Sequence, residues 1–256
     1  MRKIIESIAP KLLAVLYYIK KEVLIKKDER KQNYNRKLLL SQFVKKNDLV
    51  FDVGANMGNR VASLLGIKAK VVAFEPQQEC ATYLKRRFGE KIVVVEKGLG
   101  AEETTKEFFI SNANTLSSFS TEWINSVKAH RFQEYNWDTK VVIPMSTLDK
   151  QIDKYGIPVF IKIDVEGYEF EVLQGLSYPI KMISFEYTVP EQIEKALNCI
   201  NQIEMYNTNI ECNYIIGENN LFALNQWCNT VDIKRLIKTE EFIMTGFGDI
   251  YIRTRP

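Results

Sequence analysis

Short apolar runs alternate with amphipathic stretches from position 48 onward. An apolar run of about 4–8 residues bounded by polar or turn residues is typical of a buried strand, whereas apolar positions three and four apart are typical of a helix. The predicted strands span 49–53, 70–74, 92–96, 160–165, 182–187 and 246–253, an extended segment spans 106–110, and the predicted helices span 60–65, 77–88 and 169–175. This alternation predicts an α/β fold with a doubly wound, mostly parallel sheet, in which the late strand pairs antiparallel.

Two stretches lie outside this alternation. Residues 112–140 are rich in Asn, Ser, Trp and Tyr and lack a clear period, which indicates a lid or a substrate-binding loop. Residues 1–47 are predicted to form a basic helical extension, with an amphipathic helix over 4–27. Packing of this helix on its own domain is the preferred interpretation, and weak self-association or weak binding to a membrane surface are the alternatives.

The composition is typical of one globular core. Of the 256 residues, 46% are apolar and 26% are charged, which is enough to build a single sizeable domain. The four cysteines form no C-x-x-C pair, and the only histidine, His130, lies in a stretch typical of an exposed basic helix. We therefore predict no zinc site, no resident metal and no disulfide framework.

The charge and the apolar runs bear on where the protein acts. The net charge of +3 comes mainly from basic pairs in the N-terminal extension, and the apolar run 12–19 is too short to span a bilayer. We expect a cytoplasmic protein, with peripheral binding to the inner face of the membrane as the alternative.

The chain turns on glycines directly after the first predicted strand. Asp52 lies at the end of that strand, and Gly54 and Gly58 flank Asn56 in the turn. In an open α/β sheet, ligands bind at the carboxyl ends of the strands, and glycine lets the backbone approach a ligand closely. The spacing G-x-x-x-G differs from the G-x-G-x-x-G of dinucleotide-binding proteins and lacks the G-K-[ST] end of a triphosphate-binding loop. The turn therefore predicts a site for a charged small ligand and gives no support to phosphoryl transfer.

Acidic side chains follow two further predicted strands. Glu75, followed by Pro76, comes about 20 residues after the glycine turn, where an acidic side chain accepts hydrogen bonds from a ribose diol. Asp164 and Glu166 alternate across the end of the strand 160–165. If that strand continued, both would share one face with Lys162, and burying neighbouring acids costs several kcal/mol unless a cation or a ligand pairs with them. We interpret the two acids as functional; the alternative is that Asp164 caps the next helix and Glu166 is solvated.

The strings Val50 to Gly58, Phe74 to Pro76 and Ile161 to Gly167 together resemble the FkbM-type family of S-adenosylmethionine-dependent methyltransferases. The resemblance runs from residue 48 to 253. It implies a Rossmann-like class I methyltransferase fold over 48–256 and S-adenosylmethionine as the cofactor.

The resemblance also implies a role for individual residues. The methionine end of the cofactor would lie over residues 52–58, its ribose on Glu75, and its transferred methyl group beside Asp164. Gly98 and Leu99 would flank the adenine, and a serine pair would lie near the cofactor. The implied cofactor-binding residues are Asp52, Gly54, Ala55, Asn56, Gly58, Asn59, Glu75, Pro76, Gly98, Leu99, Ser117, Ser118 and Asp164.

We expect the methyl group to go to a hydroxyl of a sugar, a glycan or a small natural product. An alcohol must lose its proton, and the candidate bases are Asp164 and Glu166, ranked first, and Glu186. A sugar is favoured because the aromatic and amide-rich segment 123–137 offers rings for stacking.

Three other interpretations stay open. In a metal-assisted O-methyltransferase, Asp164 and Glu166 would bind Mg²⁺ that orients a substrate diol. A nucleic-acid methyltransferase is disfavoured, and no nucleic-acid partner is expected, because the basic residues cluster far from the glycine turn. A non-catalytic module would bind S-adenosylmethionine without transferring its methyl group.

Overall fold

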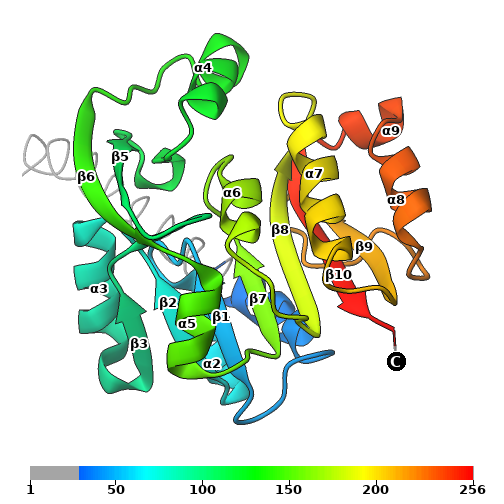
Figure 1. Ribbon diagram of the computed structural model, residues 1–256, viewed down its shortest axis with the longest axis horizontal. Coiled ribbons are helices and arrows are strands. Elements are labelled where there is room, and N and C mark those ends of the chain that lie inside the picture. The colour runs from blue at the N-terminus through cyan, green and yellow to red at the C-terminus, as the bar shows by residue number, and fades with distance from the viewer. Residues whose placement is uncertain (1–28, 256) are drawn as a thin grey trace, which may run out of the picture.

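The fold is built on a seven-stranded sheet with the strand order β3-β2-β1-β7-β8-β10-β9, seen in a computed structural model that describes residues 29–255 (Figure 1). β10 runs antiparallel to both β8 and β9, and the other neighbours are parallel. This order confirms the predicted doubly wound, mostly parallel sheet with a late antiparallel strand. The strands are β1 (Leu49–Val53), β2 (Lys70–Phe74), β3 (Ile92–Val95), β7 (Phe160–Ile163), β8 (Met182–Thr188), β9 (Ile210–Ile216) and β10 (Phe247–Thr254).

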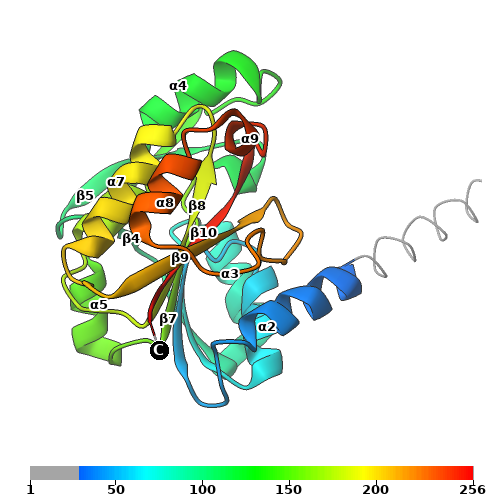
Figure 2. The same ribbon diagram turned by 90° about the vertical axis from the view of Figure 1, so that its right-hand side faces the viewer.

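Helices cover both faces of this sheet (Figures 1 and 2). One face packs against the helical residues 29–40, α2 (Asn59–Ile67) and α3 (Gln78–Phe88), which is followed by the short η1 (Gly89–Lys91). The other face packs against α5 (Leu148–Tyr155), α6 (Glu169–Gln174), α7 (Ile193–Glu204), α8 (Thr230–Leu236) and α9 (Glu240–Ile243). We call these the α2 face and the α7 face.

The alternation of side chains along each strand sorts residues between the two faces. Val50 packs in the cluster under the α2 face, and Phe51 packs in the cluster under the α7 face. Because the period is two, Asp52 lies on the α2 face with Val50. Lys162 lies on the same face, since Phe160 packs there and Ile161 does not.

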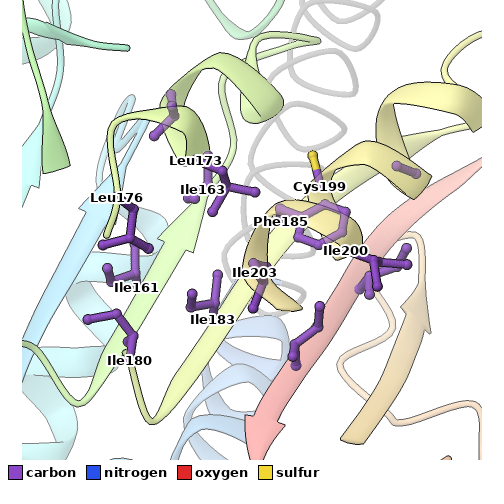
Figure 3. Packing of buried hydrophobic residues seen from close by; sticks show 14 of the residues in the cluster. Ile161, Ile163, Leu173, Leu176, Ile180, Ile183, Phe185, Cys199, Ile200 and Ile203 are labelled. Carbon is purple, nitrogen blue, oxygen red and sulfur yellow. The ribbon is translucent and has the colours of Figure 1, made fainter. Parts of the chain in front are cut away.

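The α7 face holds the larger apolar core, and Figure 3 shows the part around α6 and α7. Ile183 and Phe185 of β8 pack there with Leu173 of α6 and Ile200 of α7, all fully buried or nearly so. Burying one such side chain contributes about 1.5–3 kcal/mol. This core holds β7 and β8 in place behind their polar carboxyl ends.

A second sheet, of three strands, flanks the segment 112–140. Its order is β4 (Gly98–Leu99), β6 (Thr139–Ser146) and β5 (Thr105–Ile110). The segment contains η2 (Asn114–Leu116) and α4 (Thr121–His130), so it is not the irregular stretch that its composition predicts. Ser120 Oγ accepts a hydrogen bond from the Trp123 amide and caps α4. Polar Asn, Ser and Lys positions conceal the helical period in the sequence.

The other differences from the prediction concern the boundaries of elements and the elements that it missed. The strands predicted over 92–96 and 160–165 end at Val95 and Ile163. Helices α5, α7, α8 and α9 and strands β4, β6 and β9 are absent from the prediction, because they lie outside the motifs on which it depended. The predicted helix over 4–27 lies outside the described residues. Within residues 29–255, no helix combines the length and the apolar character that crossing a membrane requires.

Candidate active site

A pocket of about 1160 Å³ opens at the carboxyl ends of β1, β2, β7 and β8. Sites for one small molecule usually enclose roughly 300–1000 Å³, so this pocket has room for two ligands. Residues of α4, the segment after it and the helical residues 29–36 complete its wall. The pocket therefore lies where an open α/β sheet binds its ligands.

The turn after β1 is shaped by its first glycine. Gly54 has φ +82°, and a Cβ atom at this residue would lie 1.7 Å from the backbone oxygen of Asp164. Only glycine lets the turn approach the end of β7 this closely. The amides of Gly54 and Ala55 both donate to the Phe74 oxygen, at 3.0 and 3.1 Å, and thereby fix the turn to the end of β2.

Glu75 holds the same turn from the end of β2. Its carboxylate accepts hydrogen bonds from the backbone amides of Asn56, at 2.7 Å, and Gln77, at 2.8 Å. Glu75 is only 2% exposed, and burial raises its pKa to about 7, although the two amides oppose the shift. An ionised carboxylate has about four acceptor positions, so roughly two stay available to a ligand in the pocket.

The structure brings most of the sequence-predicted cofactor residues to this pocket, and three lie behind its wall. Asp52, Gly58 and Ser118 do not line it. Gly58 packs against Leu84 and Phe88 of α3, and Ser118 Oγ donates to the backbone oxygen of Glu166 at 2.6 Å. The predicted residues that line the pocket are Gly54, Ala55, Asn56, Asn59, Glu75, Pro76, Gly98, Leu99, Ser117 and Asp164.

Asp52 is fully buried on the α2 face. Within the described residues its carboxyl oxygens accept no hydrogen bond, and Arg60 Nη1 lies 3.6 Å from Oδ1. Burial raises the pKa of Asp52, and the positive charges of Arg60 and Lys162 offset part of this shift. Its contribution to ligand binding stays a prediction.

The turn after β7 gathers the predicted catalytic carboxyl groups. The strand ends at Ile163, and positive φ angles at Glu166 (54°) and Gly167 (84°) redirect the chain. One carboxyl oxygen from each of three residues lies within 4.8 Å of the others, and all three residues line the pocket: Asp164, Glu166 and, from β8, Glu186.

Another glutamate, Glu169, stabilises this turn. Its Oε1 accepts hydrogen bonds from the amides of Val165, at 3.0 Å, and Gly167, at 3.2 Å. No side chain caps α6, so Asp164 does not have the capping role of the alternative interpretation. The Asp164 carboxyl group is therefore available for contacts with neighbouring cations.

Two cations distinguish Asp164 from the neighbouring glutamates. Asp164 Oδ2 lies 3.3 Å from Lys162 Nζ and 3.5 Å from Arg60 Nη1. Burial alone would raise the pKa of Asp164, but the two cations outweigh it and lower this pKa. Burial and the negative charge of Asp164 raise the pKa of both Glu166 and Glu186 well above the ordinary value. The cluster is thus asymmetric, with the negative charge held at Asp164.

Lys162 lies fully buried under this cluster. Its Nζ donates to Asp249 Oδ1 of β10 at 2.6 Å and to the Ile163 oxygen at 3.1 Å. Burial disfavours its charge, yet the attraction of Asp164 and Asp249 is stronger and raises the pKa of Lys162. Lys162 therefore joins β7 to β10 beneath the pocket.

Sequence reasoning does not find several residues of the site. Arg60 follows the glycine turn by two positions, and this proximity is the one sequence signal that it could face Asp52 and Asp164. Whether its side chain points toward them depends on how α2 is rotated on the sheet. Asp249 carries no sequence signal as the partner of Lys162. The helical residues 29–36 reach the pocket from outside every motif. His130 is exposed at the end of α4, as predicted.

Comparison with known proteins gives a family and distant relatives. The model of the FkbM methyltransferase domain matches residues 52–227. The chain is 28% identical over 152 residues to a hexuronic acid methyltransferase of Haloferax volcanii, and the aligned part covers 57% of each chain, so it spans just over half of that relative's length.

Solved structures are also similar to this chain. A precorrin-6y C5,15-methyltransferase of Geobacter metallireducens has 11% identity, coverage of 86% of both chains and a TM-score of 0.45. A TehB-like S-adenosylmethionine-dependent methyltransferase of Corynebacterium glutamicum has 8% identity, coverage of 87% of this chain and 88% of its own, and a TM-score of 0.45.

The residues at the pocket fit S-adenosylmethionine. Gly54 keeps the turn after β1 free of a side chain, and Glu75 offers unused acceptor positions to a ribose diol. The negative charge held at Asp164 in this pocket would attract a positively charged sulfur. We call Gly54, Ala55, Asn56 and Glu75 the cofactor wall. The chain belongs to the FkbM methyltransferase domain family.

Proposed function

We propose that the protein is a methyltransferase that transfers the methyl group of S-adenosylmethionine to a hydroxyl oxygen of a sugar or a sugar-containing small molecule. The observation that carries this proposal is the convergence of Asp164, Glu166 and Glu186 within the pocket. S-adenosylmethionine supplies a methyl group on a positively charged sulfur, so the chain has to hold the acceptor and accept its proton. A hydroxyl, which does not ionise at neutral pH, needs such a base.

The three carboxyl groups suit different tasks. Asp164 is paired with Lys162 and Arg60, which makes it a weak base. Glu186 lines the pocket, and no group in the described part of the chain donates a hydrogen bond to its carboxyl oxygens. Its pKa and that of Glu166 are raised, so each is a stronger base than Asp164 when it is ionised. We propose Glu186 and Glu166 as the proton acceptors, and Asp164 as the fixed negative charge beside the methyl group.

A sugar is supported by two independent observations. The relative from Haloferax volcanii is named as a hexuronic acid methyltransferase. In addition, Phe132 and Tyr135, which follow α4, line the pocket and offer aromatic rings.

The test is methyl transfer from S-adenosylmethionine with a radioactive methyl group to a panel of monosaccharides, uronic acids and nucleotide sugars. We expect a labelled, alkali-stable methyl ether on a member of the panel. Glu186→Gln or Glu166→Gln should lower kcat by roughly 10²–10⁴-fold and leave the affinity for S-adenosylhomocysteine within a few-fold. Glu122→Gln, at an exposed position of α4, is the control. Label only in non-sugar acceptors, or none at all, would contradict the proposal.

A metal-assisted reaction is a second candidate, because three carboxyl oxygens within 4.8 Å resemble the oxygen ligands that Mg²⁺ prefers. Removal of divalent ions with a chelator separates the two candidates. Undiminished transfer after chelation supports direct proton acceptance by a glutamate, whereas loss of transfer that Mg²⁺ restores supports the metal.

A further inference from the structure

The helical residues 29–40 do more than cover the sheet. Glu29, Gln32, Asn33 and Arg36 all line the pocket. Their spacing of three and four residues places them on one side of a helix. Leu39 and Leu40 at the end of the same helix are buried in the core under the α2 face. The helix is thus anchored by its apolar end and presents a polar side to the pocket.

Polar contacts hold this side in a fixed position. Arg36 donates to Asn33 Oδ1 at 3.2 Å and to Glu218 Oε2 at 3.1 Å. Asn220 Nδ2 donates to Gln32 Oε1 at 3.3 Å, and Ser63 Oγ of α2 donates to the backbone oxygen of Asn33 at 3.4 Å. Figure 2 shows this helix, in blue, beside α2 and close to the orange loop that follows β9. The helix is therefore positioned by two other elements before any ligand arrives.

The same side retains unused hydrogen-bonding groups of both kinds. Within the described residues, the amide nitrogens of Gln32 and Asn33 donate to no acceptor. The Arg36 side chain is only 11% exposed, and its one carboxylate partner among residues 29–255 is Glu218, which is itself 64% exposed. Donors thus lie next to carboxylates that accept. A sugar hydroxyl is both a donor and an acceptor, so it matches such a mixed surface.

An aromatic ring borders these polar groups. Phe247, at the start of β10, lines the pocket and is 42% exposed. Its backbone oxygen accepts from the Gly217 amide at 2.8 Å, so it adjoins Glu218. Phe247 also pairs with Thr188 of β8, two residues beyond Glu186. An exposed ring beside donors and acceptors offers an apolar face to the C–H groups of a sugar, on the side that leads to the carboxyl cluster.

We infer that Gln32, Asn33, Arg36, Glu218 and Phe247 form a binding subsite for a polyhydroxylated, carbohydrate acceptor. We call these five residues the polar wall. This inference rests on the proposed function and adds where the acceptor is recognised. Gln32, Asn33 and Arg36 precede the matched family domain, which begins at residue 52, and Phe247 follows it. Glu218 lies inside the matched range, so the subsite combines one residue of the matched domain with four residues outside it.

The test measures acceptor binding without methyl transfer. D-glucuronic acid, D-glucose and maltotriose are the probes, and saturation-transfer NMR titrations on the full chain with S-adenosylhomocysteine give their dissociation constants. We expect at least one probe to bind, and Arg36→Ala to weaken it about tenfold or more. Arg30→Ala is the matched control, because Arg30 is exposed on the same helix and does not line the pocket. Affinity for S-adenosylhomocysteine should stay within about twofold in both variants.

A second pair of variants tests the ring of Phe247, which is 42% exposed. Phe247→Leu should weaken the same probe several-fold, and Phe247→Tyr should not, because it retains the aromatic face. Equal probe affinities in Arg36→Ala and Arg30→Ala, or no binding of any probe to the unmodified protein, would overturn the inference. The proposed function fails separately: probes that bind the polar wall without ever accepting a methyl group refute the proposed function alone. Sugar methylation that is indifferent to Arg36 and Phe247 refutes only the subsite.

Discussion

The two walls of the pocket are built in different ways. The cofactor wall consists of turns at the ends of neighbouring parallel strands, and backbone hydrogen bonds from Gly54, Ala55 and Asn56 fix it. The polar wall consists of side chains from a helix, a loop and a strand end, and its contacts join partly exposed groups such as Arg36 and Glu218. The cofactor wall cannot change without disturbing the sheet. The polar wall can change while the fold persists, which suits a part that selects the acceptor.

The largest effect is expected beneath the pocket that the two walls enclose, at the buried Lys162. Lys162→Met leaves Asp249 and Asp164 without their buried cation, so the free energy of unfolding should fall by about 3–5 kcal/mol. Lys140→Met is the control, because Lys140 and Glu107 form an exposed pair worth less than about 1 kcal/mol. Urea unfolding curves measure both. Similar losses in the two variants would show that β7 and β10 are not joined through Lys162.

The substitution Gly54→Ala should disturb the cofactor wall and leave the polar wall unchanged. The new Cβ would have to displace the turn from the end of β7, which disturbs the backbone groups of the wall, so affinity for S-adenosylhomocysteine should drop by about tenfold or more. Gly89→Ala shares a positive φ but meets no atom within 4 Å, and it should bind normally. Calorimetric titration compares them. Normal binding by Gly54→Ala would mean that the wall is less rigid than its contacts indicate.

A smaller effect is the pH dependence of ligand affinity at Glu75 of the cofactor wall. Burial raises the pKa of Glu75 to about 7, and donors on a ribose favour its ionised form. Affinity for S-adenosylhomocysteine should therefore fall as the pH drops below about 7, by up to about tenfold per pH unit, and level off above it. Titrations of the unmodified protein and Glu75→Gln between about pH 5.5 and 8.5 isolate this group. An identical pH dependence in both proteins would exclude Glu75 as the cause.

The smallest effect is expected on the acceptor side, at α4. Arg131 Nη2 donates to the Val189 oxygen at 2.9 Å and pairs with Glu191 at 3.2 Å, which holds α4 over the pocket. Arg131→Ala should raise the KM for the acceptor by a few-fold, at most about tenfold, and leave cofactor affinity unchanged. Lys128→Ala, exposed on the same helix, is the control. A change in cofactor affinity instead would show that α4 supports the cofactor wall.

The contrast between the walls also explains what could be predicted from sequence. The ranges 49–53 and 70–74 match β1 and β2, because a buried apolar run and a following turn are local signals. Gly54, Glu75 and Asp164 follow such strands directly, so topology alone brings them together. Arg36 and Glu218 are 182 positions apart, and no spacing indicates that they meet. Nor does a pattern show which way α2 turns Arg60, because packing of the helix on the sheet determines that direction.

The position of β10 has a consequence for the order in which the molecule can be assembled. β10 is made after every other strand, yet it lies between β8 and β9. A chain emerging from the ribosome therefore exposes the edge of β8 and leaves β9 unpaired until the residues from Phe247 onward appear. The same strand brings Asp249 to Lys162 and Phe247 to the pocket. Closure of the sheet, pairing of Lys162 with Asp249 and completion of the acceptor side thus all wait for the synthesis of one strand.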